Sequence, residues 1–171
     1  ILSGRINPSG KLAMTFPYST GQIPIYYNRR KSGRGHQGFY KDITSDPLYP
    51  FGHGLSYTEF KYGTVTPSVT KVKRGDRLSV EVTVTNVGAR DGAETVHWFI
   101  SDPYCSITRP VKELKHFEKQ LIRAGETKTF RFDIDLERDF GFVNEDGKRF
   151  LEAGEYHILV QGQTVKIELI D

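Results

Sequence analysis

The chain has 171 residues, of which 37% are hydrophobic, 12% aromatic and 26% charged, values that are ordinary for one globular domain with an extension. A net charge of +3 is too small to indicate a nucleic-acid-binding protein by itself. No apolar run approaches the roughly 20 residues that span a bilayer, and the single cysteine, Cys105, excludes an internal disulfide framework.

The first third of the chain, residues 1–62, is rich in turns and poor in periodicity. Turn residues gather at 7–10, 19–21 and 31–38, and the only apolar run is 23–27. Because a structureless stretch of this length is unusual inside a compact domain, we expect it to lie on the surface of another domain.

Within this part, the sequence PLYPFGHGLSY at 47–57 combines prolines and glycines with large apolar side chains. Proline and glycine predict irregular backbone, whereas flexible linkers lack so many aromatic residues. We therefore interpret the segment as an ordered connector, and we take Tyr49, Phe51, Leu55 and Tyr57 as candidate domain-interface residues.

From about residue 64 onward the hydrophobic period is two, which is typical of half-buried β-strands. Leu78, Val80, Val82 and Val84, for example, alternate with polar residues. The same reading predicts strands at 64–70, 78–85, 95–100, 111–118, 129–135, 140–143, 156–161 and 164–170. Seven or eight short antiparallel strands with one tryptophan predict an all-β fold, an immunoglobulin-like or fibronectin type III-like sandwich over 63–171.

One expected strand has aromatic residues on both faces. Alternation directs Trp98 into the core and leaves Phe99 outside, with His97 beside it. Phe99 is either a singly exposed aromatic or part of a docking face, so His97 and Phe99 join the interface candidates. We expect residues 1–62 to fold back over the Phe99 side or to pair with another copy of the chain.

No group of residues has the arrangement of a catalytic or metal site. Ser45 and Asp46 lie in the connector, and Asp133 and Asp135 share the outward face of one strand. The histidines are scattered without ligand spacing: His36, His53, His97, His116 and His157. We therefore expect no catalytic residue, no metal and no cofactor in this chain.

A basic, tyrosine-rich cluster in the connector consists of Arg29, Arg30, Lys31 and Arg34 with Tyr26, Tyr27 and Tyr40. Such residues can bind single-stranded nucleic acid by stacking and phosphate pairing. Four charges in a turn-rich segment more often form a solvated face or pair with carboxylates of an adjoining domain, so we do not expect nucleic acid as a partner. Because no apolar run is long enough to span a bilayer, we do not expect a membrane as a partner either.

Five segments stand out as motifs: NPSGKLAMTFP at 7–17, IPIYYN at 23–28, GR at 33–34, LYPFGHGLSYTEF at 48–60 and TRPVKELKHFEK at 108–119. In this order and spacing they resemble the C-terminal end of glycoside hydrolase family 3 enzymes, the β-glucosidase and β-xylosidase group. The resemblance implies that 1–17 is the last strand of an α/β sandwich domain, 18–62 a connector and 63–171 a fibronectin type III-like domain. It departs from the family at His116, where glycine is common.

The resemblance also implies a function for the longer protein. Family members hydrolyse β-linked glycosides with retention, using a barrel Asp and a Glu acid/base, and a carboxyl separation of about 5 Å suits that route. Both residues would lie upstream of Ile1, so the expected partners are the upstream barrel and α/β domains and a β-linked oligosaccharide. The sequence does not determine the cellular compartment, and a periplasmic or secreted location of the longer protein is compatible with it. The alternative is an autonomous carbohydrate-binding or adhesion module.

Overall fold

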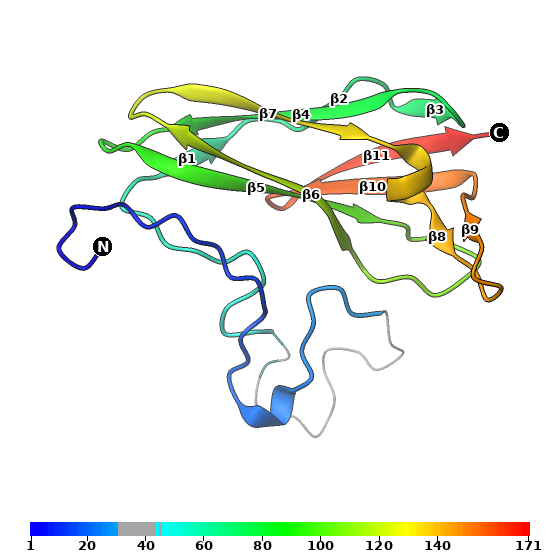
Figure 1. Cartoon of the computed structure of the whole chain (residues 1–171), viewed down its shortest axis with the longest axis horizontal. Helices are drawn as coiled ribbons and strands as arrows, with labels where there is room; N and C mark the ends of the chain where they lie inside the picture. The colour runs from blue at the N-terminus through cyan, green and yellow to red at the C-terminus, as the bar shows by residue number, and fades with distance from the viewer. Residues whose placement is uncertain (31–43, 45) are drawn as a thin grey trace.

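The structure, a computed structural model, describes residues 1–30, 44 and 46–171. Two β-sheets pack face to face, and the extended N-terminal part of the chain lies on one side of this sandwich and extends away from it (Figure 1). The expected all-β, fibronectin type III-like sandwich with an extended connector is therefore confirmed.

The smaller sheet is built around β4 (Leu78–Asn86). β7 (Thr127–Ile134) pairs with one edge of β4, and β1 (Phe60–Tyr62) and β2 (Thr66–Pro67) pair with its other edge, all antiparallel. Because β1 belongs to this sheet, the connector that we expected over 18–62 ends in a strand of the sandwich.

The larger sheet has the strand order β3–β11–β10–β5–β6. These strands are β3 (Lys71–Lys73), β11 (Gln163–Ile170), β10 (Gly154–Val160), β5 (Gly92–Ser101) and β6 (Glu113–Ile122). All neighbours are antiparallel except β3 and β11, which run parallel. A small hairpin of β8 (Phe142–Val143) and β9 (Arg149–Phe150) stands at one end of the sandwich (Figure 1).

Two short helical turns complete the described elements. The 3-10 turn η1 (Thr20–Gln22) lies in the connector, and the π-helical turn η2 (Leu136–Phe140) joins β7 to β8. No helix in the described part of the chain is both long and apolar enough to cross a bilayer.

The core follows the predicted alternation. The alternating apolar side chains of the expected strands in both sheets are at most 6% exposed: Leu78, Val80, Val82, Val84, Val96, Trp98, Ile100, Phe130, Phe132, Ile134, Tyr156, Ile158 and Val160. Alternation places a side chain on the same face every second residue, so each strand contributes one apolar row to the space between the sheets.

Of the expected strand at 64–70, only β2 forms, and the next strand belongs to the other sheet. β2 ends at Pro67 in the smaller sheet, whereas β3 begins at Lys71 in the larger one. The smaller-sheet strand ends at Pro67, because proline lacks the N–H that would continue a ladder. Val72 is 1% exposed, and it is buried because the chain crosses to the other sheet. The chain therefore changes sheets here, which strand periodicity alone does not reveal.

His116 lies next to an irregularity in the pairing of β5 and β6. It lies inside β6 opposite Trp98, and the register of β5 and β6 shifts between Trp98 and Phe99. Its ring stacks on Phe132 with centroids 5.0 Å apart. His116 thus lies within a strand, next to a β-bulge.

Candidate interface between the connector and the sandwich

In the structure, residues 1–17 and the connector over 18–59 form one extended segment, and from here on both together are called the connector. Two distant parts of it form a short antiparallel ribbon. Leu12 N donates to His53 O at 2.8 Å, and Phe16 and Tyr49 exchange backbone hydrogen bonds of 2.8 and 3.3 Å. A Cβ on Gly54 would lie 2.5 Å from Gly10 O, so this crossing requires glycine. The NPSGKL and FGHGLSY motifs are therefore two halves of one structural unit. We expected residues 1–17 to be the last strand of another domain. In the structure, Phe16 is the one residue of this range that forms a β-bridge.

Asn7 links this ribbon to the loop between β4 and β5. Its Nδ2 donates to Asp91 O at 3.0 Å, while its Oδ1 accepts from Ser56 Oγ at 3.1 Å and from Tyr57 N at 2.8 Å. An amide side chain can donate and accept at once, which a carboxylate cannot do. The asparagine of the first motif thus ties the second motif to the sandwich.

A buried charge cluster lies next to this junction. Lys11 Nζ is 3.0 Å from Glu94 Oε1, and the Glu94 side chain is only 7% exposed. Tyr62 Oη donates to the same carboxylate oxygen at 2.9 Å. Burial and the Glu94 carboxylate both raise the pKa of Tyr62, so the phenol remains a donor. The cluster joins the connector, β1 and β5 in one hydrogen-bonded group.

The outward face of β5 is covered by aromatic side chains of the connector. Tyr27 stacks on Phe51 with centroids 4.3 Å apart, and both rings meet Phe99 edge-on at 5.8 and 6.1 Å. Lys112 Nζ lies 4.6 Å from the centre of the Phe99 ring, within the range of a cation–π contact. Phe99 is therefore covered by its own chain, and the expected fold-back of the connector is confirmed.

His97 is the polar member of this aromatic cluster. Its ring meets Phe51 at 5.7 Å and Phe117 at 6.5 Å. Burial lowers the pKa of His97, the charge of Lys11 lowers it further, and Glu94 acts in the opposite direction. The cluster therefore favours a neutral imidazole.

The six interface residues proposed from the sequence fall into two groups. Phe51, His97 and Phe99 meet in the aromatic cluster just described. Tyr49, Leu55 and Tyr57 do not join it and are 43%, 74% and 47% exposed. Tyr49 packs on His53 with centroids 4.9 Å apart, and Tyr57 carries the Arg90 guanidinium at 5.9 Å from its ring.

Several contact residues were missed by sequence reasoning, although some left a signal: Asn7, Lys11, Tyr27, Tyr62, Glu94 and Lys112. Glu94 shares the inward alternation of Val96 and Trp98, and an acid in that row predicts a buried partner. Of the proposed basic cluster, Lys31 and Arg34 lie outside the described residues, as do Tyr40, His36 and Ser45.

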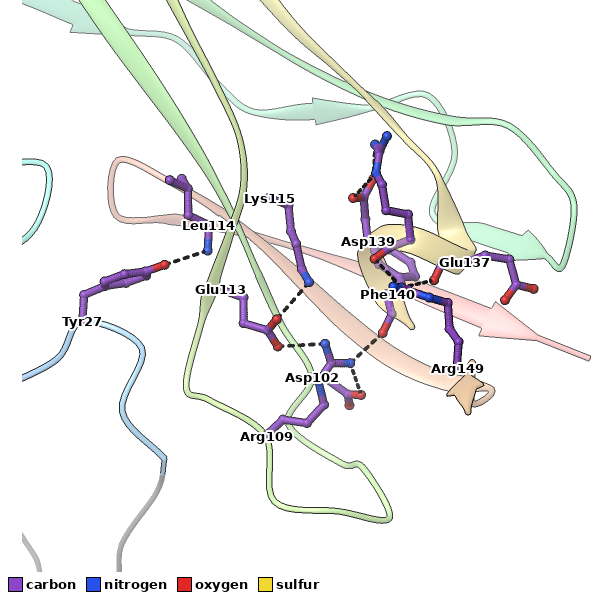
Figure 2. A network of polar contacts seen from close by, with 11 residues as sticks. Tyr27, Asp102, Arg109, Glu113, Leu114, Lys115, Glu137, Asp139, Phe140 and Arg149 are labelled. Atoms are coloured by element: carbon purple, nitrogen blue, oxygen red, sulfur yellow. Dashed lines mark hydrogen bonds and ion pairs between the residues drawn. The ribbon is translucent and has the colours of Figure 1, made fainter. Parts of the chain in front are cut away.

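Arg109, from the TRPVKELK motif, organises the opposite end of the sandwich (Figure 2). Its side chain is 5% exposed and contacts Asp102 Oδ2 at 3.1 Å, Glu113 Oε1 at 2.8 Å and Phe140 O at 2.6 Å. Lys115 Nζ holds the other Glu113 oxygen at 2.9 Å. Burial opposes ionisation of Glu113, yet its hydrogen bonds to Lys115 and Arg109 outweigh burial and lower its pKa. The network joins the 102–113 loop to η2.

The acidic residues considered as catalytic candidates have structural partners. Asp133 accepts from Arg131 Nε at 2.8 Å, and Asp135 accepts from the backbone N–H of Arg138 at 3.0 Å. Asp46 accepts from the Thr44 hydroxyl at 3.3 Å. Across the described residues, no three His, Cys, Asp or Glu side chains gather as metal ligands.

Comparison with protein families matches both parts of the chain. Residues 1–57 match the glycosyl hydrolase family 3 C-terminal domain, and residues 94–164 match the fibronectin type III-like domain. The chain is the C-terminal part of a glycosyl hydrolase family 3 protein. The two matches cover the two parts that the Lys11–Glu94 contact joins.

Curated relatives align with nearly the whole chain. A periplasmic beta-glucosidase of Salmonella typhimurium is 39% identical over 176 residues, covering 98% of this chain and 23% of its own length. A beta-xylosidase of Formosa agariphila is 39% identical over 161 residues, covering 94% of this chain and 22% of its own length. This family 3 chain thus spans less than a quarter of the length of these relatives.

Solved β-glucosidase structures superpose on nearly the whole chain, connector and sandwich together. A β-glucosidase from Erythrobacter marinus superposes with a TM-score of 0.92 at 41% identity, over 99% of this chain and 23% of the other. A β-glucosidase from Listeria innocua in complex with isofagomine gives 0.90 at 40% identity, over 98% and 25%.

Proposed function

We propose that this chain is the non-catalytic, accessory part of a retaining β-glycosidase, in which the connector attaches the sandwich to upstream catalytic domains. The main observation behind this proposal is that one side of the connector contacts the sandwich and the other side does not. One side is fixed to the sandwich through Lys11–Glu94 and the Phe51–Phe99 contact. The other side presents large apolar residues to solvent.

The free side of the connector has the composition of a domain interface. Apolar residues in this part are more than half exposed: Ile1, Leu2, Ile6, Met14, Tyr18, Ile23, Tyr26 and Leu55. So many exposed apolar side chains on one extended segment indicate a surface that is covered in the intact protein. We assign this side to the upstream α/β and barrel domains, with Tyr49, Leu55 and Tyr57 at that contact.

The chemistry of the intact protein is assigned to residues outside this chain. Most of the described carboxylates are engaged in ion pairs, turns and capping contacts, such as those of Asp102, Asp133 and Asp135. The relatives that match the chain are named as β-glucosidases and β-xylosidases. A β-linked oligosaccharide is therefore the proposed substrate of the parent. Because Phe99 is covered within one chain, pairing with another copy is not needed to explain it.

The alternative, an autonomous carbohydrate-binding module, required a free aromatic platform around Phe99. Tyr27, Phe51 and Lys112 occupy that platform. The structure therefore supports the accessory role in preference to the binding module.

A chimera tests the proposal directly. The region of the Salmonella relative that aligns with this chain is replaced by this chain, and the isolated chain and a deletion without replacement serve as controls. We expect the chimera to hydrolyse aryl β-glucosides with the sugar preference of the relative, and the isolated chain and the deletion to be inactive. Hydrolysis by the isolated chain, or a changed sugar preference in the chimera, would contradict the proposal.

A further inference from the structure

A cleft of about 310 Å³ lies where Arg30 of the connector meets the end of the sandwich that carries the β8–β9 hairpin. Arg30 lines it from the connector, Pro110 from the 102–113 loop, and Val143 and Arg149 from the β8–β9 hairpin. The connector is held there by a bridge between Arg30 and Pro110 and by Val111 N donating to Arg29 O at 2.8 Å. The cleft is therefore built from three separate segments.

Most of the charged groups of this cleft are already neutralised. Glu113, the one acidic lining residue, gives both oxygens to Arg109 and Lys115. Arg138 makes a two-pronged contact with Asp139, with distances of 2.8 Å from both Nε and Nη2. These pairs leave no described lining carboxylate for another cation.

Two further cations line the cleft without a carboxylate partner among the described residues: Arg30 and Arg149. The Arg149 guanidinium is fixed, because its Nη1 donates to Glu137 O at 3.1 Å and to Arg138 O at 3.2 Å (Figure 2). A guanidinium has five donors in a fixed fork, so Nε and Nη2 keep donors for an anion. The cleft therefore has an oriented positive group that no described carboxylate neutralises.

From this geometry we propose that the cleft between Arg30 and Arg149 binds the carboxylate of an acidic sugar residue. Ile107 and Val143 give the same cleft apolar lining for the C–H face of a sugar ring. Small-molecule sites begin at about 300 Å³, so this cleft accommodates one ring rather than a folded segment.

The choice of an acidic sugar over an acidic protein segment rests on the proposed accessory role in a glycosidase. The β8–β9 hairpin, which lines the cleft, and the N-terminal residue lie at opposite ends of the long axis of the molecule (Figure 1).

The test is calorimetric titration of the full chain with trigalacturonate, with its methyl ester, and with a Glu-rich hexapeptide. We expect trigalacturonate to bind and the methyl ester, which lacks the charge, to bind at least about tenfold more weakly. Arg149→Gln and Arg30→Gln should each weaken binding about tenfold, the effect of losing one charge-assisted contact. Arg131→Gln, on the outward face of the other sheet, is the matched control and should leave binding within about twofold.

The melting temperature of each variant shows whether a loss of binding is caused by unfolding. If Arg149→Gln unfolds, because it also loses two backbone hydrogen bonds, Arg30→Gln and Arg149→Lys decide the question. The proposal is overturned if trigalacturonate does not bind at millimolar concentration, if its methyl ester binds equally well, or if Arg30→Gln binds like the wild type. Binding of the acidic peptide alone would also overturn it and would reassign the cleft to a protein partner, while leaving the chimera result untouched.

Discussion

Lys11 and Glu94 form an ion pair of 3.0 Å across the boundary between the connector and the sandwich. Glu94 lies in the inward row of β5, and Lys11 reaches it from the NPSGKL motif. A carboxylate so deeply buried needs a partner, because an unpaired charge in that position is strongly unfavourable. The connector is therefore part of the folded unit and not a separate linker.

Replacing Lys11 by Met should destabilise the chain by about 3 kcal/mol, because it leaves the Glu94 carboxylate buried without its cation. Urea unfolding followed by tryptophan fluorescence measures this loss. Lys71→Met is the matched control, since Lys71 pairs with Glu168 at 2.8 Å but both side chains are at least half exposed. The control should change stability by less than about 1 kcal/mol, and equal losses in the two variants would contradict the inference.

Phe51→Ala should release the connector from the outward face of β5. The ring contacts Tyr27 and Phe99, and its removal should cost about 2 to 3 kcal/mol. Limited proteolysis should then cut within residues 1–57 faster than in the wild type. Leu55→Ala changes a side chain of the same segment that is 74% exposed, and it should leave the cleavage rate nearly unchanged.

Trp98→Ala should cost roughly 3 to 5 kcal/mol, because the side chain is fully buried between the sheets. Trp98→Phe should cost clearly less, since Nε1 of Trp98 has no hydrogen-bond partner among the described residues and phenylalanine removes that buried donor. Chemical unfolding followed by circular dichroism checks both. A loss below about 1 kcal/mol for Trp98→Ala would show that the faces of β5 are reversed.

Arg109→Met should destabilise the far end of the sandwich by about 3 to 5 kcal/mol, because Asp102, with a side chain 4% exposed, loses its cation. Amide hydrogen exchange should show the loss of protection concentrated in residues 102–113 and η2. Arg131→Met removes an arginine whose ion pairs are exposed, and less than about 1 kcal/mol is expected for it.

Stability should decrease as the pH falls from 7.5 to 5.5, with His97 as one cause. Burial and Lys11 lower the pKa of His97 in the folded chain below the ordinary value of 6.5. The folded state therefore binds fewer protons than the unfolded state below that pH, and its stability declines as the pH falls through this range. His97→Gln should flatten the profile measured by urea unfolding. An unchanged slope in this variant would show that other groups cause the decrease.

Much of the sandwich was predictable because strand alternation is a local property. The rows that begin at Leu78 and Phe130 are buried as their period of two requires. The crossing of 64–73 between sheets was not predictable, because which layer receives Val72 depends on the space that other strands leave. The same limit applied to Phe99, for which the sequence left two alternatives and the connector decided between them.

The sequence alone thus determined the all-β class, the inward row of β5 and the two motif segments of the connector. Local chemistry sufficed for these, since periodicity and the proline–glycine pattern act over a few residues. Only the tertiary structure decided that the motifs pair with each other, that Lys11 meets Glu94, and that Arg30 and Arg149 share one cleft. Such contacts join residues from 33 positions apart, for Phe16 and Tyr49, to 119 positions apart, for Arg30 and Arg149. Their partners are chosen by packing, geometry and buried charge rather than by any local pattern.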